Sequence, residues 1–184
     1  GLIDLSLVRD QILKIYNEKN YNLENRMFID KSLENFFYVD IIMKVFPKAK
    51  FINSIRNIED NIFAIFKQSL SKISWTHSLE NILEYIDNYF KVMNYFSNKY
   101  PENMLTINLE ELTNNSELIS KKIYSFCGLE WSEKILKFHD RKDLLISTAS
   151  NIQIRENIKK YDNEKYKPYR GYISIFKNKY SWLN

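Results

Sequence analysis

The stretch FINSIRNIED, residues 51–60, joins a short apolar run to the start of a helix. Residues 51–55 are typical of a strand. Asn57 is a favourable N-cap residue, and two acids follow it in the first turn, where the helix dipole favours negative charge. The stretch therefore predicts a strand over 51–55 and a helix over 57–69, with Arg56 at the junction.

A second strand is predicted upstream. Residues 26–30, RMFID, form a short apolar run typical of a buried strand, and residues 35–46 carry helical apolar spacing that ends at Pro47. Strand, helix and strand within about 30 residues form a βαβ unit with parallel strands. Ligands of such sheets bind beyond the carboxyl ends of the strands, so we expect Lys31 and Arg56 at neighbouring strand tips, where they form an anion site.

Taken singly, these two cations have ordinary structural explanations. A lysine after a strand is most often a solvated surface amine, and an arginine there usually makes a salt bridge, which for Arg56 means Asp30 or Asp60. An arginine fork, however, bonds two phosphate oxygens at once. Together, Lys31 and Arg56 are suited to hold a polyanionic nucleotide.

The rest of the chain predicts more helices and one more strand. Residues 105–109 alternate like a strand, and helical spacing marks residues 5–18, 75–100, 117–126, which Gly128 closes, and 132–138. Roughly the last forty residues lack clear periodicity. The pattern predicts an α/β fold, a short parallel sheet flanked by helices, in a single domain over residues 1–184.

Composition argues against several classes of function. The formal charge of +4 comes from 27 basic and 23 acidic residues spread along the chain, too weak an excess to indicate nucleic-acid binding. The three glycines form no phosphate loop in this sequence, and no apolar run approaches the roughly 20 residues of a membrane helix. Two histidines without ligand spacing argue against a metal. The single cysteine, Cys127, indicates a reducing compartment, so we expect a cytoplasmic protein.

Three residues near the C-terminus extend the expected anion site. Ser150, Arg155 and Lys165 are spaced so that a loop crossing the open end of the sheet supplies a hydroxyl and two cations. The alternative is structural, with Ser150 capping a turn and Lys165 exposed to solvent.

Five motifs resemble, in family order, those of the sulfotransferases that use 3′-phosphoadenosine-5′-phosphosulfate (PAPS). RNIED at 56–60 resembles the family's Arg-Asn-Pro-x-Asp signature, and DKSLENF at 30–36 resembles its Asp-Lys-x-Pro-x-Asn-Phe pattern. The others are FPKAK at 46–50, FCGLEW at 126–131 and TASNIQIR at 148–155. The resemblance is to a bacterial branch that is often fused to tetratricopeptide repeats and is similar to tyrosylprotein sulfotransferases.

The resemblance implies a P-loop-NTPase-like three-layer fold and transfer of a sulfuryl group from PAPS to a hydroxyl on a protein, glycan or small molecule. It implies that Arg56 binds the 3′-phosphate and that Lys31 lies near the bridging oxygen, where its charge stabilises the leaving phosphate. Ser150 and Lys165 are expected to close over the nucleotide, to which Arg155 adds a cation. No metal is implied, tetratricopeptide repeats are expected upstream, and none of these motifs specifies the acceptor.

The sequence departs from the family pattern at three positions. The serine eight residues after the signature arginine is Ala64, the proline of the lysine motif is Leu33, and the tyrosine at the end of the third strand is Leu109. The glycine-rich loop that wraps the 5′-phosphosulfate in the family is absent from this sequence. The chain thus resembles the C-terminal two-thirds of a sulfotransferase domain, and we expect the first strand and its loop upstream.

Two alternatives stay open. One is a degenerate, non-catalytic relative that keeps the fold as a binding or scaffold module, in keeping with the three departures. The other is a helical interaction domain unrelated to nucleotides, which helical structure in the three predicted strands would favour.

Overall fold

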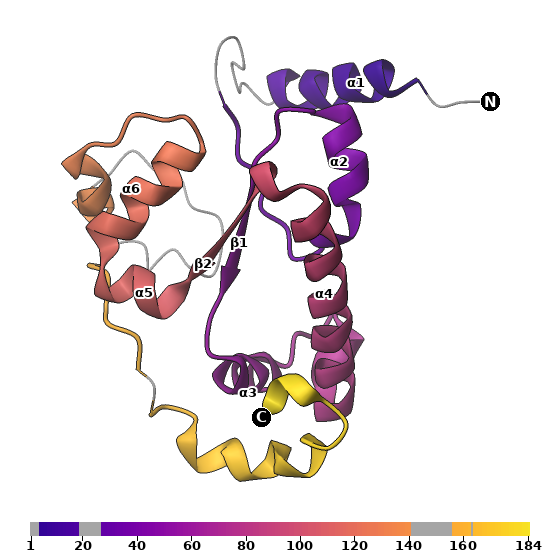
Figure 1. Ribbon diagram of the computed structural model, residues 1–184, viewed down its shortest axis with the longest axis vertical. Coiled ribbons are helices and arrows are strands. Elements are labelled where there is room, and N and C mark those ends of the chain that lie inside the picture. Colours follow the sequence, from indigo (N-terminus) through magenta and orange to yellow (C-terminus); the bar gives the residue numbers. More distant parts are fainter. Residues whose placement is uncertain (1–3, 19–26, 141–155, 163) are drawn as a thin grey trace. The chain divides into compact units, whose positions relative to one another are not determined.

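The computed structural model describes residues 4–18, 27–140, 156–162 and 164–184. The chain divides into two compact units. The N-terminal unit holds residues 1–49 and 89–103, and the sheet unit holds residues 50–88 and 104–184. Helix α4 (Leu79–Lys99) contributes its first half to the sheet unit and its second half to the N-terminal unit (Figure 1).

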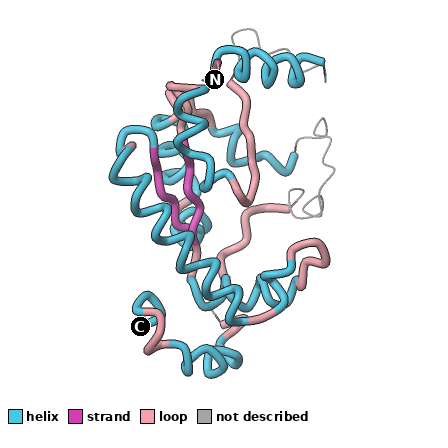
Figure 2. Tube along the Cα trace, turned by 90° about the vertical axis from the view of Figure 1, so that its right-hand side faces the viewer, coloured by secondary structure: helices cyan, strands magenta, loops and turns pink. Residues whose placement is uncertain are grey.

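The sheet unit is built on two parallel strands, β1 (Phe51–Ile55) and β2 (Met104–Asn108), which run side by side in Figure 2. The register pairs Phe51 with Met104 and Ile55 with Asn108, so both strands end at one edge. The predicted strand over 51–55 is confirmed, and the one predicted over 105–109 lies one residue earlier.

The chain between the strands forms the crossover that a parallel pair requires. It passes through α3 (Ile58–Gln68), a 3₁₀ turn η2 (Ser74–His77) and α4. Ile62 of α3 and Ile82 and Leu83 of α4 have no exposed surface, and burial of each contributes roughly 1.5–3 kcal/mol. These apolar contacts make the core of the sheet unit.

Two helices follow β2, namely α5 (Leu109–Asn114) and α6 (Ser116–Phe126). Gly128 closes α6 as predicted: its φ is 67°, its N–H donates to the carbonyl of Ser125, and the N–H of Leu129 donates to that of Tyr124. This pair of bonds is a Schellman motif, which favours glycine because the left-handed conformation is strained for other residues.

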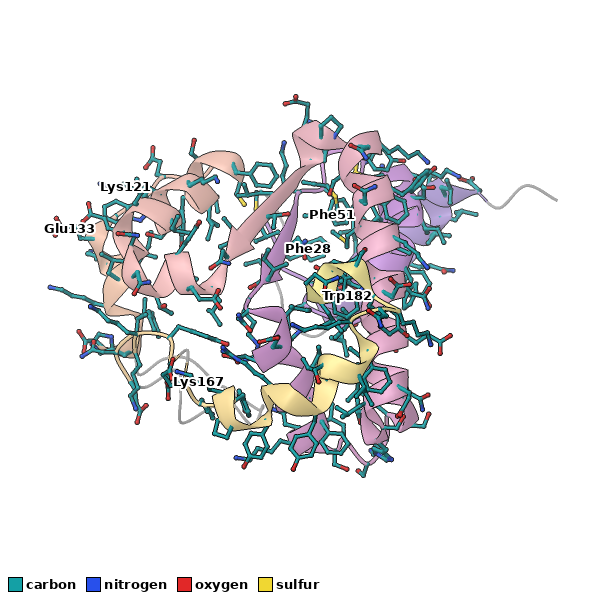
Figure 3. The ribbon with its side chains drawn as sticks, turned by 60° about the horizontal axis from the view of Figure 1, so that its bottom comes forward. Phe28, Phe51, Lys121, Glu133, Lys167 and Trp182 are labelled. Carbon is teal, nitrogen blue, oxygen red and sulfur yellow. The ribbon has the colours of Figure 1, made fainter. Side chains whose placement is uncertain are left out.

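The helices described after α6 are 3₁₀ helices, namely η4 (Glu133–Asp140), η7 (Lys167–Phe176) and η8 (Ser181–Leu183). The helix predicted over 132–138 is therefore 3₁₀, and η7 lies where the sequence shows no clear periodicity. The less exposed residues of η7 recur every third position, as in a 3₁₀ helix, and among them Ile173 has no exposed surface and lies in the core. Trp182, labelled in Figure 3, donates from Nε1 to Asp87 Oδ1 at 3.0 Å and anchors the C-terminus on α4.

The N-terminal unit contains α1 (Leu5–Glu18), η1 (Asn35–Tyr38), α2 (Val39–Val45), the second half of α4 and η3 (Pro101–Asn103). Phe28 packs between Tyr16 and Phe46, with ring centroids 4.8 and 5.8 Å apart. Asp40 of α2 accepts hydrogen bonds from Lys99 and from Tyr100 at the end of α4. An aromatic cluster and one polar clamp thus hold this unit together.

The prediction of a strand over 26–30 is wrong for the described residues of that run. Residues 27–30 form no strand, and Ile29 is 88% exposed. Of this apolar run, Phe28 packs in the aromatic cluster. A segment with no adjacent strand forms no inter-strand hydrogen bonds, so nothing stabilises it as a strand. The strand that pairs with β1 is β2, so the predicted βαβ unit over 26–55 is not formed and Lys31 follows no strand tip.

In the described part of the chain, no helix combines the length and the apolar character needed to cross a lipid bilayer.

Candidate anion site at the carboxyl edge of the sheet

The segments that leave β1 and β2 meet at the shared carboxyl edge. Arg56 and Asn57 follow β1, and Glu110 stands two residues after β2. The backbone N–H of Asn57 donates to Glu110 Oε1 at 2.7 Å. Because the register pairs the last residues of both strands, this bond links the two segments that follow them and fixes the position of the backbone next to Arg56.

Helix α3 begins at this edge with the predicted cap. The Asn57 side chain accepts from the backbone N–H of Asp60 at 3.0 Å, which satisfies one of the helix's first donors. Glu59 and Asp60 fill the first turn, where the positive end of the helix dipole stabilises them. The sequence FINSIRNIED thus forms the structure that its residue types predict.

Arg56 is half-buried and, within the described ranges, pairs with no carboxylate. Its Nε donates to the neutral side-chain oxygen of Asn61 at 3.1 Å. Of the other arginines that the structure describes, Arg9 pairs with Asp10 at 3.4 Å, and Arg170 pairs with Glu59 at 3.0 Å and Asp60 at 3.2 Å. The predicted salt bridge of Arg56 with an acid is thus not formed among the described residues, and its terminal nitrogens can bind an anion bidentately.

Asp60 is the buried centre of a polar network next to Arg56. It has no exposed surface, and its two oxygens accept from the Tyr161 hydroxyl at 3.0 Å and from Arg170 Nη2 at 3.2 Å. Charge pairing and hydrogen bonds offset the cost of burying a carboxylate. Arg170 is thereby occupied by acids, in contrast to Arg56.

Tyr161 lies within the electrostatic field of this cluster. Burial and the hydrogen bond to Asp60 raise the pKa of Tyr161 to about 12, while the charge of Arg56 opposes the shift. The phenol is therefore a neutral donor near pH 7. Its backbone N–H donates to Thr113 Oγ1 of α5 at 3.3 Å.

Glu110 brings an acid to the same edge. Its Oε1 accepts from Asn57, whereas its Oε2 is buried and accepts no hydrogen bond from any described residue. Glu110 and Arg56 have opposite effects on the pKa of Tyr161, which the carboxylate raises and the guanidinium lowers. Glu110 therefore opposes the positive charge of Arg56 at the edge where an anion would bind.

The remaining predicted site residues are Lys31, Ser150, Arg155 and Lys165. Lys31 is exposed in the N-terminal unit. Lys165 is exposed in the sheet unit, with its Nζ 5.4 Å from the centre of the neighbouring Tyr166 ring, which matches the structural alternative for this residue. Ser150 and Arg155 lie outside the described residues.

The structure adds Tyr161 and Arg170, which the sequence analysis did not single out. Arg170 carried a usable signal, because arginine is rare in this lysine-rich chain and a rare arginine is informative. Tyr161 carried none, since tyrosine is frequent throughout. Within the described ranges, no group of three or more His, Cys, Asp or Glu side chains is arranged to hold a metal ion.

The fold and this edge define an α/β protein with an arginine at the carboxyl end of a parallel sheet, the end at which such sheets bind ligands. The model of the sulfotransferase family matches residues 3–133. The chain therefore belongs to the sulfotransferase family. The match includes Arg56 and Lys31 and ends before Ser150, Arg155 and Lys165.

A relative is an uncharacterized protein of Aquifex aeolicus (strain VF5). It is 26% identical to this chain over 155 residues, which cover 82% of this chain and 20% of the relative. The chain thus spans about a fifth of that protein's length.

Proposed function

We propose that the protein transfers a sulfuryl group from PAPS to a hydroxyl acceptor and that Arg56 binds the 3′-phosphate of the nucleotide. Family membership supports the reaction class. The observation that carries the binding role is the half-buried Arg56, which is oriented by a neutral amide and is not paired with a carboxylate of any residue that the structure describes. A guanidinium in this state retains its charge and two donors for a phosphate.

In this reaction the acceptor oxygen forms a bond to sulfur while the bond from sulfur to the bridging oxygen breaks. The electron pair leaves with the bisphosphate, and the acceptor proton passes to a base. We assign Lys31 to the developing charge on the leaving oxygen. Ser150, Arg155 and Lys165 are assigned to closing over the nucleotide, and a protein, glycan or small molecule supplies the hydroxyl.

We assign residues 1–184 to a single sulfotransferase-like domain, the C-terminal two-thirds of a P-loop-NTPase-like three-layer fold. A strand and a glycine-rich loop for the 5′-phosphosulfate would precede it, together with tetratricopeptide repeats in a longer, cytoplasmic protein of the bacterial branch. The two-stranded sheet and its helical crossover support this assignment.

A second candidate function is a non-catalytic binding or scaffold module. Glu110 favours it, because its carboxylate occupies the Asn57 N–H at the start of α3, where an anion would otherwise accept. Ala64, on the same helix, offers no hydroxyl to a phosphate.

Calorimetric titration of the full-length protein with 3′,5′-adenosine bisphosphate tests the proposal. We expect a Kd on the order of micromolar, and Arg56→Ala should weaken binding about 100-fold, as for the loss of a charge-assisted pair of bonds. Arg9→Ala, at an exposed arginine of α1, is the matched control and should bind as the wild type does.

Three outcomes separate the hypotheses. Arg56-dependent binding together with sulfate transfer from PAPS to a hydroxyl acceptor supports the enzyme. Binding by a protein that never transfers sulfate favours the non-catalytic module. Absence of binding, or equal effects of Arg56→Ala and Arg9→Ala, contradicts the assignment of Arg56 to the nucleotide.

A further inference from the structure

Asp60 ties the C-terminal segment, residues 156–184, to the start of α3. Its two donors, Tyr161 and Arg170, stand 101 and 110 residues further along the chain. Each carboxylate oxygen has one of these donors, and the side chain has no exposed surface. A buried ion this well satisfied fixes the position of its partners, since moving either one leaves a charge unpaired.

Aromatic packing supports the same connection one turn further along α3. The ring of Phe63 lies 6.3 Å from that of Tyr166 and 5.9 Å from that of Tyr169. Asp60 and Phe63 are three residues apart and therefore share a face of the helix. The polar contacts set the register of the C-terminal segment on α3, and the rings supply buried area.

Tyr161 also reaches the helix that follows the other strand. Its hydroxyl donates to Asp60 of α3, which follows β1, and its backbone N–H donates to Thr113 of α5, which follows β2. One residue thus bridges the two helices that leave the carboxyl edge of the sheet. Arg56 stands four residues before Asp60, which accepts the Tyr161 hydroxyl, and its charge opposes the rise in the pKa of Tyr161.

We propose that Tyr161 and Asp60 are positioning residues, whose hydrogen bond holds the C-terminal segment at the carboxyl edge and thereby sets the affinity of Arg56 for the 3′-phosphate. This inference rests on the proposed function. Glu59 and Asp60 neutralise Arg170, so Arg170 holds the segment in place and adds no net charge to the site. Neither positioning residue takes part in breaking or making a bond.

Tyr161→Phe tests the proposal because it removes one hydroxyl and keeps the ring. In the full-length protein we expect the Kd for 3′,5′-adenosine bisphosphate to rise on the order of tenfold, as for one lost hydrogen bond to a charged group. The KM for PAPS should rise with kcat unchanged. Amide exchange over residues 157–170 should accelerate without nucleotide. Tyr172→Phe is the matched control, since its side chain is 68% exposed on the same segment, and it should change none of these values.

A double-mutant cycle that combines Tyr161→Phe with Asp60→Asn tests whether the two side chains act through their hydrogen bond. If the two side chains act through their shared bond, the doubly substituted protein should bind the bisphosphate about as weakly as the worse single variant. Additive effects contradict the proposal. If Asp60→Asn does not fold, the comparison of Tyr161→Phe with Tyr172→Phe decides alone.

The failures of the two proposals look different. Faster exchange in Tyr161→Phe with an unchanged Kd, while Arg56→Ala still abolishes binding, overturns the positioning role and leaves the proposed function intact. A wild-type protein that does not bind the bisphosphate overturns the proposed function and the positioning role together.

Discussion

Arg170 Nη2 lies 3.2 Å from Oδ1 of Asp60, a carboxylate with no exposed surface in the first turn of α3. The signature acid next to Arg56 is therefore not a partner of Arg56. It is occupied by an arginine 110 residues away, and the Tyr161 hydroxyl takes its second oxygen. Arg56 instead donates to the neutral amide oxygen of Asn61, so its positive charge stays available to an anion.

Asp60→Ala should destabilise the protein by about 3 kcal/mol, because it leaves the Tyr161 hydroxyl and part of the Arg170 charge buried without their acceptor. Asp60→Asn, which keeps an acceptor oxygen, should cost less. Urea unfolding followed by circular dichroism measures both. Glu117→Ala, which removes an exposed carboxylate paired with Lys121, should stay within about 0.5 kcal/mol of the wild type. Equal losses for Asp60→Ala and Glu117→Ala contradict a central role for the buried acid.

Arg56→Lys separates charge from geometry at the proposed anion site. Lysine keeps the positive charge but loses the planar fork and the Nε bond to Asn61. We expect binding of 3′,5′-adenosine bisphosphate to weaken about tenfold, less than for Arg56→Ala. Calorimetry at two salt concentrations measures the Kd and its salt dependence, with Arg9→Lys as the control. Wild-type affinity in Arg56→Lys shows that a point charge is sufficient.

Much of the sheet unit could be predicted from sequence because its signals are local. The cap at Asn57, the acids of the first turn and the closing Gly128 each act within four residues of their partners. The strands at 51–55 and 104–108 were likewise predictable from short apolar runs. The same local pattern correctly placed Arg56 at the end of a strand.

The remainder depends on contacts between distant residues. Residues 26–30 resemble a strand by composition, but a strand also needs a neighbour, and the sequence does not show that β1 pairs with β2. Tyr161 and Arg170 donate to Asp60 although more than a hundred residues separate them from it in the sequence. Arg170 lies in a 3₁₀ helix, whose three-residue repeat matches neither the α-helical nor the strand period that the sequence analysis tested.

Tyr161 should titrate late. Its pKa of about 12 in the folded protein, against an ordinary 10.0, means that the neutral phenol is favoured by folding. The resulting stability is fully present below pH 10 and is lost as the pH rises through 12. The pKa of Tyr100 is also raised, by its hydrogen bond to Asp40, so absorbance at 295 nm should show a late-titrating component that Tyr161→Phe reduces and Tyr172→Phe leaves unchanged. If Tyr172→Phe instead removed this late titration, the assignment of the raised pKa to Tyr161 would be contradicted.

The clamp in the N-terminal unit should make that unit sensitive to acid. The Lys99 ammonium and, next, the Tyr100 hydroxyl hold the pKa of Asp40 below its ordinary 3.8. A depressed carboxyl pKa contributes stability above the ordinary value, and this stability is lost as the pH falls through the folded value. Asp40→Asn should therefore lower the melting temperature at pH 7, and its difference from the wild type should shrink as the pH falls below the ordinary carboxyl pKa of 3.8. Asp10→Asn, at an exposed acid of α1, is the control, and a constant gap between Asp40→Asn and the wild type contradicts the assignment.

Glu110→Gln should tighten nucleotide binding. Glu110 adds a negative charge to the edge at which Arg56 is proposed to bind a phosphate, and glutamine removes that charge while its oxygen can still accept from the Asn57 N–H. At a partly desolvated site, removing one repulsive charge is worth on the order of 1 kcal/mol, so the Kd for 3′,5′-adenosine bisphosphate should fall about fivefold. Glu111→Gln is the matched control, because this neighbouring acid is exposed and should leave the Kd unchanged. Weaker binding in Glu110→Gln would mean that the carboxylate supports the site by holding Asn57, and the assignment of the phosphate to this edge would then need a different set of donors.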